Sequence, residues 1–207
     1  QKILMCPPDK YGVEYVINPW MEGQLGHTDI ALAQRQWQGL REALATEADI
    51  VTMPPVAGLP DLVFTANAGF VLGDTAVVSH FRTKERQGEE SYDTNWFQQN
   101  GFTITDWPRD VFFEGAGDAL IDRGQGFIWC GYGFRSDFAA AGLLEKIYAR
   151  RTVALKLADP RFYHLDTCLC PLAGGYVMYF PPAFDEASQR LIAEHVSPEK
   201  RIIIPES

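Results

Sequence analysis

The chain has 207 residues, of which 46% are hydrophobic and 13% aromatic, and this is enough apolar material for a packed core. Its 27 acidic and 18 basic residues give a net charge of −9, and the basic residues form no run longer than a pair. These numbers argue against a protein that binds nucleic acid or an anionic membrane and favour a small-molecule or protein partner. No apolar stretch approaches the ~20 residues of a membrane span, and the first residues lack a secretory signal pattern, so we expect a cytoplasmic protein.

Strand and helix patterns alternate from the beginning of the chain. Apolar and β-branched runs predict strands at 2–6 and 11–18. From residue 29 to 45 apolar side chains recur at the three- and four-residue spacing of a helix, with Thr28 or Asp29 as the N-cap.

Three further cycles of strand, hairpin and helix follow this first one. Helices are predicted at 82–101, 136–151 and 185–196, and the segments between them read as short strands and hairpins: 49–56, 62–74, 75–81, 102–108, 115–133, 152–157 and 162–180. The cycle is about 50 residues long, which favours a circular or stacked α/β repeat over a doubly wound sheet. A further strand begins at residue 201, and no linker divides the chain, so residues 1–207 are predicted to form one domain.

A small set of polar residues stands inside otherwise apolar text: Asp61, Asn67, Glu114, Asp118, Arg135, His164 and Asp166. Burying such groups costs free energy unless a partner compensates. In a strand His164 and Asp166 would point to the same face. A histidine beside carboxylates can act as a general acid and base, and converging acceptors suit a planar guanidinium.

Each of these residues alone has an ordinary structural explanation, such as a buried pair or a turn cap. Their recurrence at similar places in successive repeats weakens that explanation, because a ring of repeats would bring them to a common axis. A metal site at His164, Cys168 and Cys170 is a weaker hypothesis, since the spacing does not match structural zinc sites. The four cysteines are expected to be reduced, with Cys168 and Cys170 packed in the core.

Five segments together make the chain resemble the guanidino-group modifying (pentein) superfamily. They are LPDLVFTANAGF (59–70), FRTKERQGE (81–89), FFEGAGDAL (112–120), GYGFRSD (131–137) and FYHLDTCLCPL (162–172). The superfamily includes arginine deiminases, arginine dihydrolases, dimethylarginine hydrolases and glycine amidinotransferases. The resemblance implies a five-bladed α/β propeller, an arginine-like substrate, and neither a metal nor an organic cofactor.

The resemblance also implies roles for the residues that carry chemistry. His164 resembles the general acid and base of the family, and Glu114 resembles the carboxylate that hydrogen-bonds to it. Asp166 resembles the carboxylate that holds the guanidinium. Asn67 stands where deiminases usually carry a second such aspartate.

The asparagine at this position removes one negative charge, which favours a neutral ureido intermediate over a cationic guanidinium. Together with Asn18, Asn67 resembles the arginine dihydrolases, in which a citrulline-like intermediate is attacked again to give ornithine. Asp61 resembles a residue near the amine end of the substrate, whereas Arg86 and Arg135 resemble those that bind its α-carboxylate.

The nucleophilic cysteine of the family lies in a C-terminal fifth repeat, and the sequence ends at Ser207 before such a repeat. The chain is therefore interpreted as a propeller without its fifth repeat, either a fragment of a longer enzyme or a truncated form. A guanidino hydrolase is the first hypothesis. The alternatives are an amidinotransferase and a non-catalytic binding module of the same fold. The sequence leaves the oligomeric state open, and a homo-oligomer is one possibility.

Overall fold

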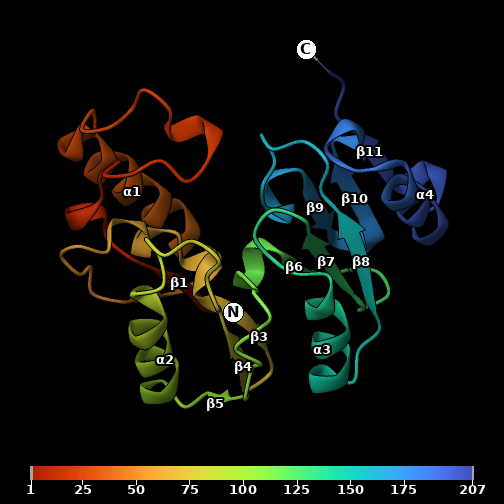
Figure 1. The fold of residues 1–207 in the computed structure, drawn as a ribbon, viewed down its shortest axis with the longest axis horizontal. Coiled ribbons are helices and arrows are strands. Elements are labelled where there is room, and N and C mark those ends of the chain that lie inside the picture. The colour runs from red at the N-terminus through yellow and green to blue at the C-terminus, as the bar shows by residue number, and fades with distance from the viewer. Residues whose placement is uncertain (1, 207) are drawn as a thin grey trace.

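The computed structural model describes residues 2–206, which fold into a mixed α/β structure of small sheets with helices on their outer sides (Figure 1). One complete unit runs from β3 (Gly69–Leu72) through β4 (Thr75–Val78) and α2 (Glu89–Gln99) to β5 (Thr103–Ile104). Strands β3 and β4 form an antiparallel hairpin, and β5 returns parallel to β4. The unit is therefore a hairpin, a helix and a parallel strand.

The same arrangement occurs twice more along the chain. The next unit consists of β6 (Ala119–Ile121), β7 (Ile128–Tyr132), α3 (Ala139–Tyr148) and β8 (Thr152–Lys156). It is followed by β9 (Leu169–Leu172), β10 (Tyr176–Tyr179), α4 (Glu186–His195) and β11 (Arg201–Ile203). The predicted repeat is confirmed, but its phase is shifted, because the strands expected to open each cycle close the preceding sheet instead.

The first sheet differs from the other three. Among residues 2–206 it contains only β1 (Lys2–Met5) and β2 (Asp49–Thr52), which pair in parallel and are joined through α1 (Ile30–Ala45). Asp29 caps α1 by accepting a hydrogen bond from the amide of Leu32 at 2.9 Å. No residue of α1 is fully buried, so this helix covers its sheet less completely than α2, α3 and α4 cover theirs.

The prediction of a strand at 11–18 is wrong. This segment has no regular ladder and leads into a short 3-10 turn at Pro19–Met21. Its backbone forms isolated hydrogen bonds, such as the bond from the amide of Val13 to Thr28 Oγ1 at 3.2 Å. No helix within residues 2–206 combines the length and apolar character required to cross a membrane.

A 3-10 turn precedes the inner strand of each complete unit, and these turns meet at the centre of the molecule. They cover Thr65–Ala68, Gly115–Gly117 and Leu165–Thr167, and the second contacts both of the others. Buried clusters around Trp129 and Phe113 support the turns from outside. The core therefore holds equivalent positions of successive repeats against one another.

Candidate active site

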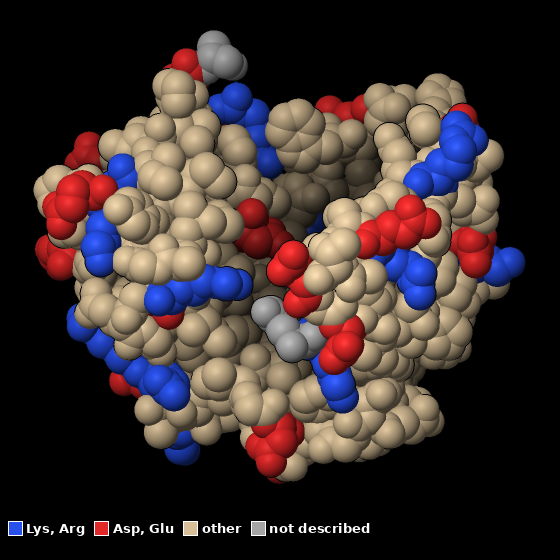
Figure 2. All heavy atoms as spheres, turned by 180° about the vertical axis from the view of Figure 1, so that it is seen from behind, with Lys and Arg blue, Asp and Glu red and all other residues tan. Residues whose placement is uncertain are grey.

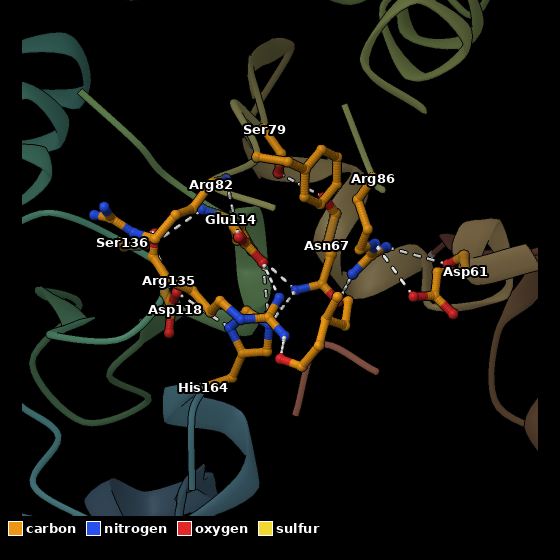
Figure 3. A network of polar contacts seen from close by, with 12 residues as sticks. Asp61, Asn67, Ser79, Arg82, Arg86, Glu114, Asp118, Arg135, Ser136 and His164 are labelled. Carbon is orange, nitrogen blue, oxygen red and sulfur yellow. Dashed lines mark hydrogen bonds and ion pairs between the residues drawn. The ribbon is translucent and has the colours of Figure 1, made fainter. Parts of the chain in front are cut away.

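A cavity of about 680 Å³ opens beside the turns Thr65–Ala68 and Leu165–Thr167. The residues predicted for the site that line it are Asn18, Asp61, Asn67, Arg86, Arg135, His164 and Asp166. Figure 2, which views the molecule from behind, shows a hollow between the two sides of the molecule with acidic side chains at its edge. Glu114 is fully buried behind this lining, and Figure 3 shows it pointing toward His164.

His164 lies between two carboxylates. Its Nδ1 is 3.1 Å from Asp118 Oδ2, and its Nε2 is 3.4 Å from Glu114 Oε2. The histidine is only 4% exposed. Burial alone would lower its pKa, but the charges and hydrogen bonds of Asp118 and Glu114 outweigh burial and raise the pKa to about 9. The site therefore favours the imidazolium, the form that can donate a proton.

Glu114 is held in its ionised form by its neighbours. Its Oε2 accepts a hydrogen bond from Arg135 Nη1 at 2.9 Å, and its Oε1 accepts one from the amide of Arg82 at 3.2 Å. Burial would raise its pKa, yet the hydrogen bond and charge of His164, together with the charge of Arg135, lower it to about 2.

Asp118 is the second partner of His164, and sequence reasoning assigned it no role. Besides the histidine, its Oδ2 accepts a bond from Ser136 Oγ at 2.6 Å, and its Oδ1 accepts one from the amide of Leu165 at 3.1 Å. The available signal was its place four residues after Glu114, at the end of the same glycine-rich turn. A turn of that length brings both carboxylates to one side chain.

The side-chain amide of Asn67 is oriented by hydrogen bonds at both ends. Its Nδ2 donates to the carbonyl oxygen of Glu114 at 3.0 Å and lies 3.4 Å from His164 Nε2. Its Oδ1 accepts from Arg86 Nη1 at 3.0 Å. A Cβ at Gly117 would overlap Asn67 Nδ2, which explains why this turn needs a glycine beside the asparagine.

Arg86 is buried among acceptors from the protein. It pairs with Glu89 through Nε at 2.9 Å and Nη2 at 2.7 Å, and its Nη2 also donates to the carbonyl oxygen of Asp61 at 3.1 Å. Glu89 is 1% exposed, and it was not among the predicted site residues. These contacts make Arg86 a support for Asn67; its role toward a substrate carboxylate stays a prediction.

Arg135 connects the site to the irregular segment near the N-terminus. Its Nη2 donates to the carbonyl oxygen of Ile17 at 2.9 Å, and its guanidinium lies over the ring of Tyr163, 4.8 Å from the centroid. Next to Ile17, Asn18 Oδ1 accepts from the amide of Trp20 at 3.0 Å and caps the 3-10 turn there. A cation is thus fixed in the cavity wall.

Asp166 faces the cavity from the turn Leu165–Thr167. The expectation that it shares a strand face with His164 is wrong, because the chain turns between them and β9 begins only at Leu169. Partial desolvation raises the pKa of Asp166 to about 6, against the lowering effect of His164. The turn nevertheless brings both residues to the same cavity.

No family model matches the chain. Over 206 residues it is 54% identical to the bifunctional arginine dihydrolase/ornithine cyclodeaminase AgrE of Nostoc sp., a match that covers all of this chain and 29% of that relative. It is 39% identical over 196 residues to the dimethylarginine dimethylaminohydrolase of Mycobacterium tuberculosis, covering 93% of this chain and 63% of that enzyme. The chain therefore spans less than a third of the length of AgrE.

The crystal structure of the N-terminal domain of ArgZ, a cyanobacterial arginine dihydrolase, in a substrate-bound Cys-to-Ser mutant, superimposes with a TM-score of 0.97. The two are 53% identical, and the match covers 99% of this chain and 76% of that one. The chain belongs to the guanidino-group modifying (pentein) superfamily. Its mixed α/β architecture is that of its pentein neighbours.

None of the four cysteines of this pentein chain lines the cavity that contains His164, although Cys168 Sγ lies 3.8 Å from the carbonyl oxygen of His164. Cys6, Cys130 and Cys168 are buried, and burial raises the pKa of each thiol, that of Cys6 to about 12. The expected core packing is wrong for Cys170, which is exposed and lines two other cavities. Within residues 2–206 no group of three or more His, Cys, Asp or Glu side chains has the geometry of a metal site.

Proposed function

We propose that this chain is part of a hydrolase that attacks the guanidino carbon of arginine and releases ornithine, as an arginine dihydrolase does. The observation that carries the proposal is the buried acid–base group of His164, Glu114 and Asp118, which opens beside Asn67 onto a cavity large enough for an amino acid. The similarity to AgrE and to the N-terminal domain of ArgZ supports the same chemistry.

In the proposed reaction a thiolate attacks the guanidino carbon while Asp166 and Asn67 hold the guanidino nitrogens. His164 gives its proton to the departing nitrogen, the carbon–nitrogen bond breaks, and ammonia leaves. The neutral histidine then takes a proton from the water that hydrolyses the carbon–sulfur bond. Because Asn67 carries no charge, the citrulline-like product stays bound for a second attack by the thiolate, in which the second ammonia leaves. Hydrolysis of the remaining carbon–sulfur bond gives a carbamate, which breaks down to carbon dioxide and ornithine.

The other polar residues of the cavity would bind the amino acid end of the substrate. Asp61 is 2% exposed and would accept hydrogen bonds from the α-amino group. Arg86 and Arg135 would attract the α-carboxylate, and Asn18 would close this end of the cavity. The proposed steps use only side chains and water.

The nucleophilic thiol is proposed to come from residues outside these 207. In support, none of the four cysteines lines the cavity with His164. The first sheet also has two strands where the other three sheets have three. A further repeat with an added strand next to β1 would make the sheets equivalent and give the five-bladed propeller.

The test is to incubate the full-length protein with L-arginine and to measure ornithine, citrulline and ammonia. Ornithine with two ammonia molecules per arginine is expected, and His164→Ala should abolish turnover. Citrulline without ornithine would reject the dihydrolase proposal. Transfer of the amidino group to added glycine would indicate an amidinotransferase, and binding of arginine without any product would indicate a binding module.

A cytoplasmic location and a homo-oligomeric state remain predictions. Cell fractionation would test the location, and sedimentation would test the oligomeric state.

A further inference from the structure

We propose that Ser136 is a positioning residue for His164 and acts on it through the carboxylate of Asp118, a role that rests on the acid–base function proposed above. Ser136 lies between β7 and α3, outside the lining of the cavity. Figure 3 shows Ser136 in the same part of the polar network as Asp118 and Glu114. It would not touch substrate, and its effect would pass through the histidine.

The first step concerns which nitrogen of His164 carries the permanent proton. Ser136 Oγ donates to Asp118 Oδ2 at 2.6 Å, and the same oxygen lies 3.1 Å from His164 Nδ1. Because Oδ2 accepts the serine hydroxyl, the tautomer in which His164 Nδ1 donates to the same oxygen satisfies both contacts. Nδ1 therefore keeps its proton, and Nε2 is the nitrogen that exchanges one.

The second step concerns the direction of the serine hydroxyl. Ser136 Oγ accepts a hydrogen bond from the amide of Glu114 at 3.0 Å. Since this N–H occupies one lone pair of Oγ, the hydroxyl hydrogen is directed toward Asp118. The side chain thus joins the two acidic residues that flank His164.

The third step is that Asp118 has little freedom once these bonds are formed. Its Oδ1 accepts from the amide of Leu165, and its carbonyl oxygen accepts from the amide of Gly131 at 2.8 Å. A Cβ at Gly131 would lie 2.8 Å from Leu165 Cβ and 3.3 Å from Asp118 Oδ1. Both Asp118 and Ser136 are 1% exposed, so water cannot easily replace a lost hydroxyl.

The test measures the pKa of His164 by NMR in full-length protein labelled with ¹⁵N-histidine, with the signal assigned from His164→Gln. In Ser136→Ala, Asp118 Oδ2 loses the donor that competes with His164. The pKa of His164 should rise by about 0.5, which corresponds to the lower part of the net contribution of one hydrogen bond. The limb of the kcat profile assigned to His164 should move to higher pH by the same amount. Glu114, Arg135, Asp166 and Arg86, the other charged groups around His164, are unchanged.

Ser79→Ala is the matched control. Ser79 is 3% exposed, and its hydroxyl donates to the carbonyl oxygen of Asn67 at 2.5 Å. The substitution therefore removes a similar buried hydrogen bond, but one in which Asp118 takes no part. It should lower the melting temperature but leave the pKa of His164 in place. If Ser136→Ala does not fold, Ser136→Cys, with its weaker donor, should shift the pKa in the same direction by less.

An unchanged or lowered pKa in the folded Ser136 variant would overturn the proposal and leave Ser136 a purely structural residue. The NMR titration does not depend on turnover. A protein inactive on arginine would therefore refute the proposed function while the titration still decided the role of Ser136.

Discussion

At the residue scale, Arg86 shows how this protein keeps a charge in its interior. The guanidinium is 3% exposed and is satisfied by Glu89, Asn67 and the backbone of Asp61. The guanidinium also lies over the ring of Phe81, with its carbon 4.5 Å from the ring centroid. A buried ion pair contributes little beyond its desolvation cost, but removing one partner leaves the other charge buried and unpaired.

Replacing Arg86 by methionine should therefore destabilise the protein strongly. The expected loss in the free energy of unfolding is about 3–5 kcal/mol, measured by urea denaturation. Arg190→Met is the control, since Arg190 pairs with Glu186 on the surface at 3.7 Å and should change stability by less than about 0.5 kcal/mol. If Arg86→Met lowers the free energy of unfolding by no more than the control does, the buried Glu89 does not need Arg86 as a partner.

At the element scale, the irregular segment 12–28 is held over the cavity by two long-range hydrogen bonds. Trp20 Nε1 donates to the carbonyl oxygen of Arg161 at 2.8 Å, and Arg135 Nη2 donates to that of Ile17. Trp20 itself is 64% exposed. With few buried side chains, this segment depends on these two bonds more than a strand in a sheet would.

Trp20→Phe should loosen the segment without disturbing the core. Losing one hydrogen bond of about 1 kcal/mol should make chymotrypsin cleavage within 12–28 roughly five-fold faster and raise the KM for substrate. Trp107→Phe loses a comparable bond, from Nε1 to the carbonyl oxygen of Val111 at 2.7 Å, away from the cavity. Equal cleavage rates in both variants would contradict a role for the Trp20 bond.

At the scale of the whole molecule, the fold gathers ionisable groups at its centre, and this couples stability to pH. The pKa of His164 is raised from 6.5 to about 9, so its contribution is complete below pH 6.5 and is lost as the pH rises through 9. The pKa of Glu114 is lowered from 4.5 to about 2, so its contribution is present above pH 4.5 and is lost as the pH falls through 2.

The free energy of unfolding should accordingly fall between pH 6.5 and 9, by at most about 3.4 kcal/mol from His164. Urea titrations at several pH values in this window measure it. His164→Gln should remove most of the decline, because glutamine does not titrate. A wild-type protein with the same stability at both ends of the window would contradict the raised pKa of His164.

The regular elements could be predicted wherever local pattern decided them. The helices α2, α3 and α4 lie inside the predicted ranges. Hairpins are also present within the predicted segments 115–133 and 162–180, and the second turns at Gly174, whose φ is 76°. The strand predicted at 11–18 failed because its apolar residues pack over a cavity and not in a sheet. The sequence also did not predict with which strands β5, β8 and β11 pair, since strand pairing depends on contacts between residues distant in sequence.

The sequence by itself determined the repeat, the glycine-rich turn after Glu114 and the unusual polar residues, because backbone preference and burial cost act locally. Only the tertiary structure decided that His164 lies between Asp118 and Glu114, and that Arg86 is held by Glu89 while it orients Asn67. Apart from the Arg86–Glu89 pair, whose members are three residues apart, those contacts join segments that are 19 or more residues apart, and side-chain spacing along the chain cannot specify them. The packing of successive repeats around one centre does, since it leaves each buried charge only the partners that the neighbouring turns supply.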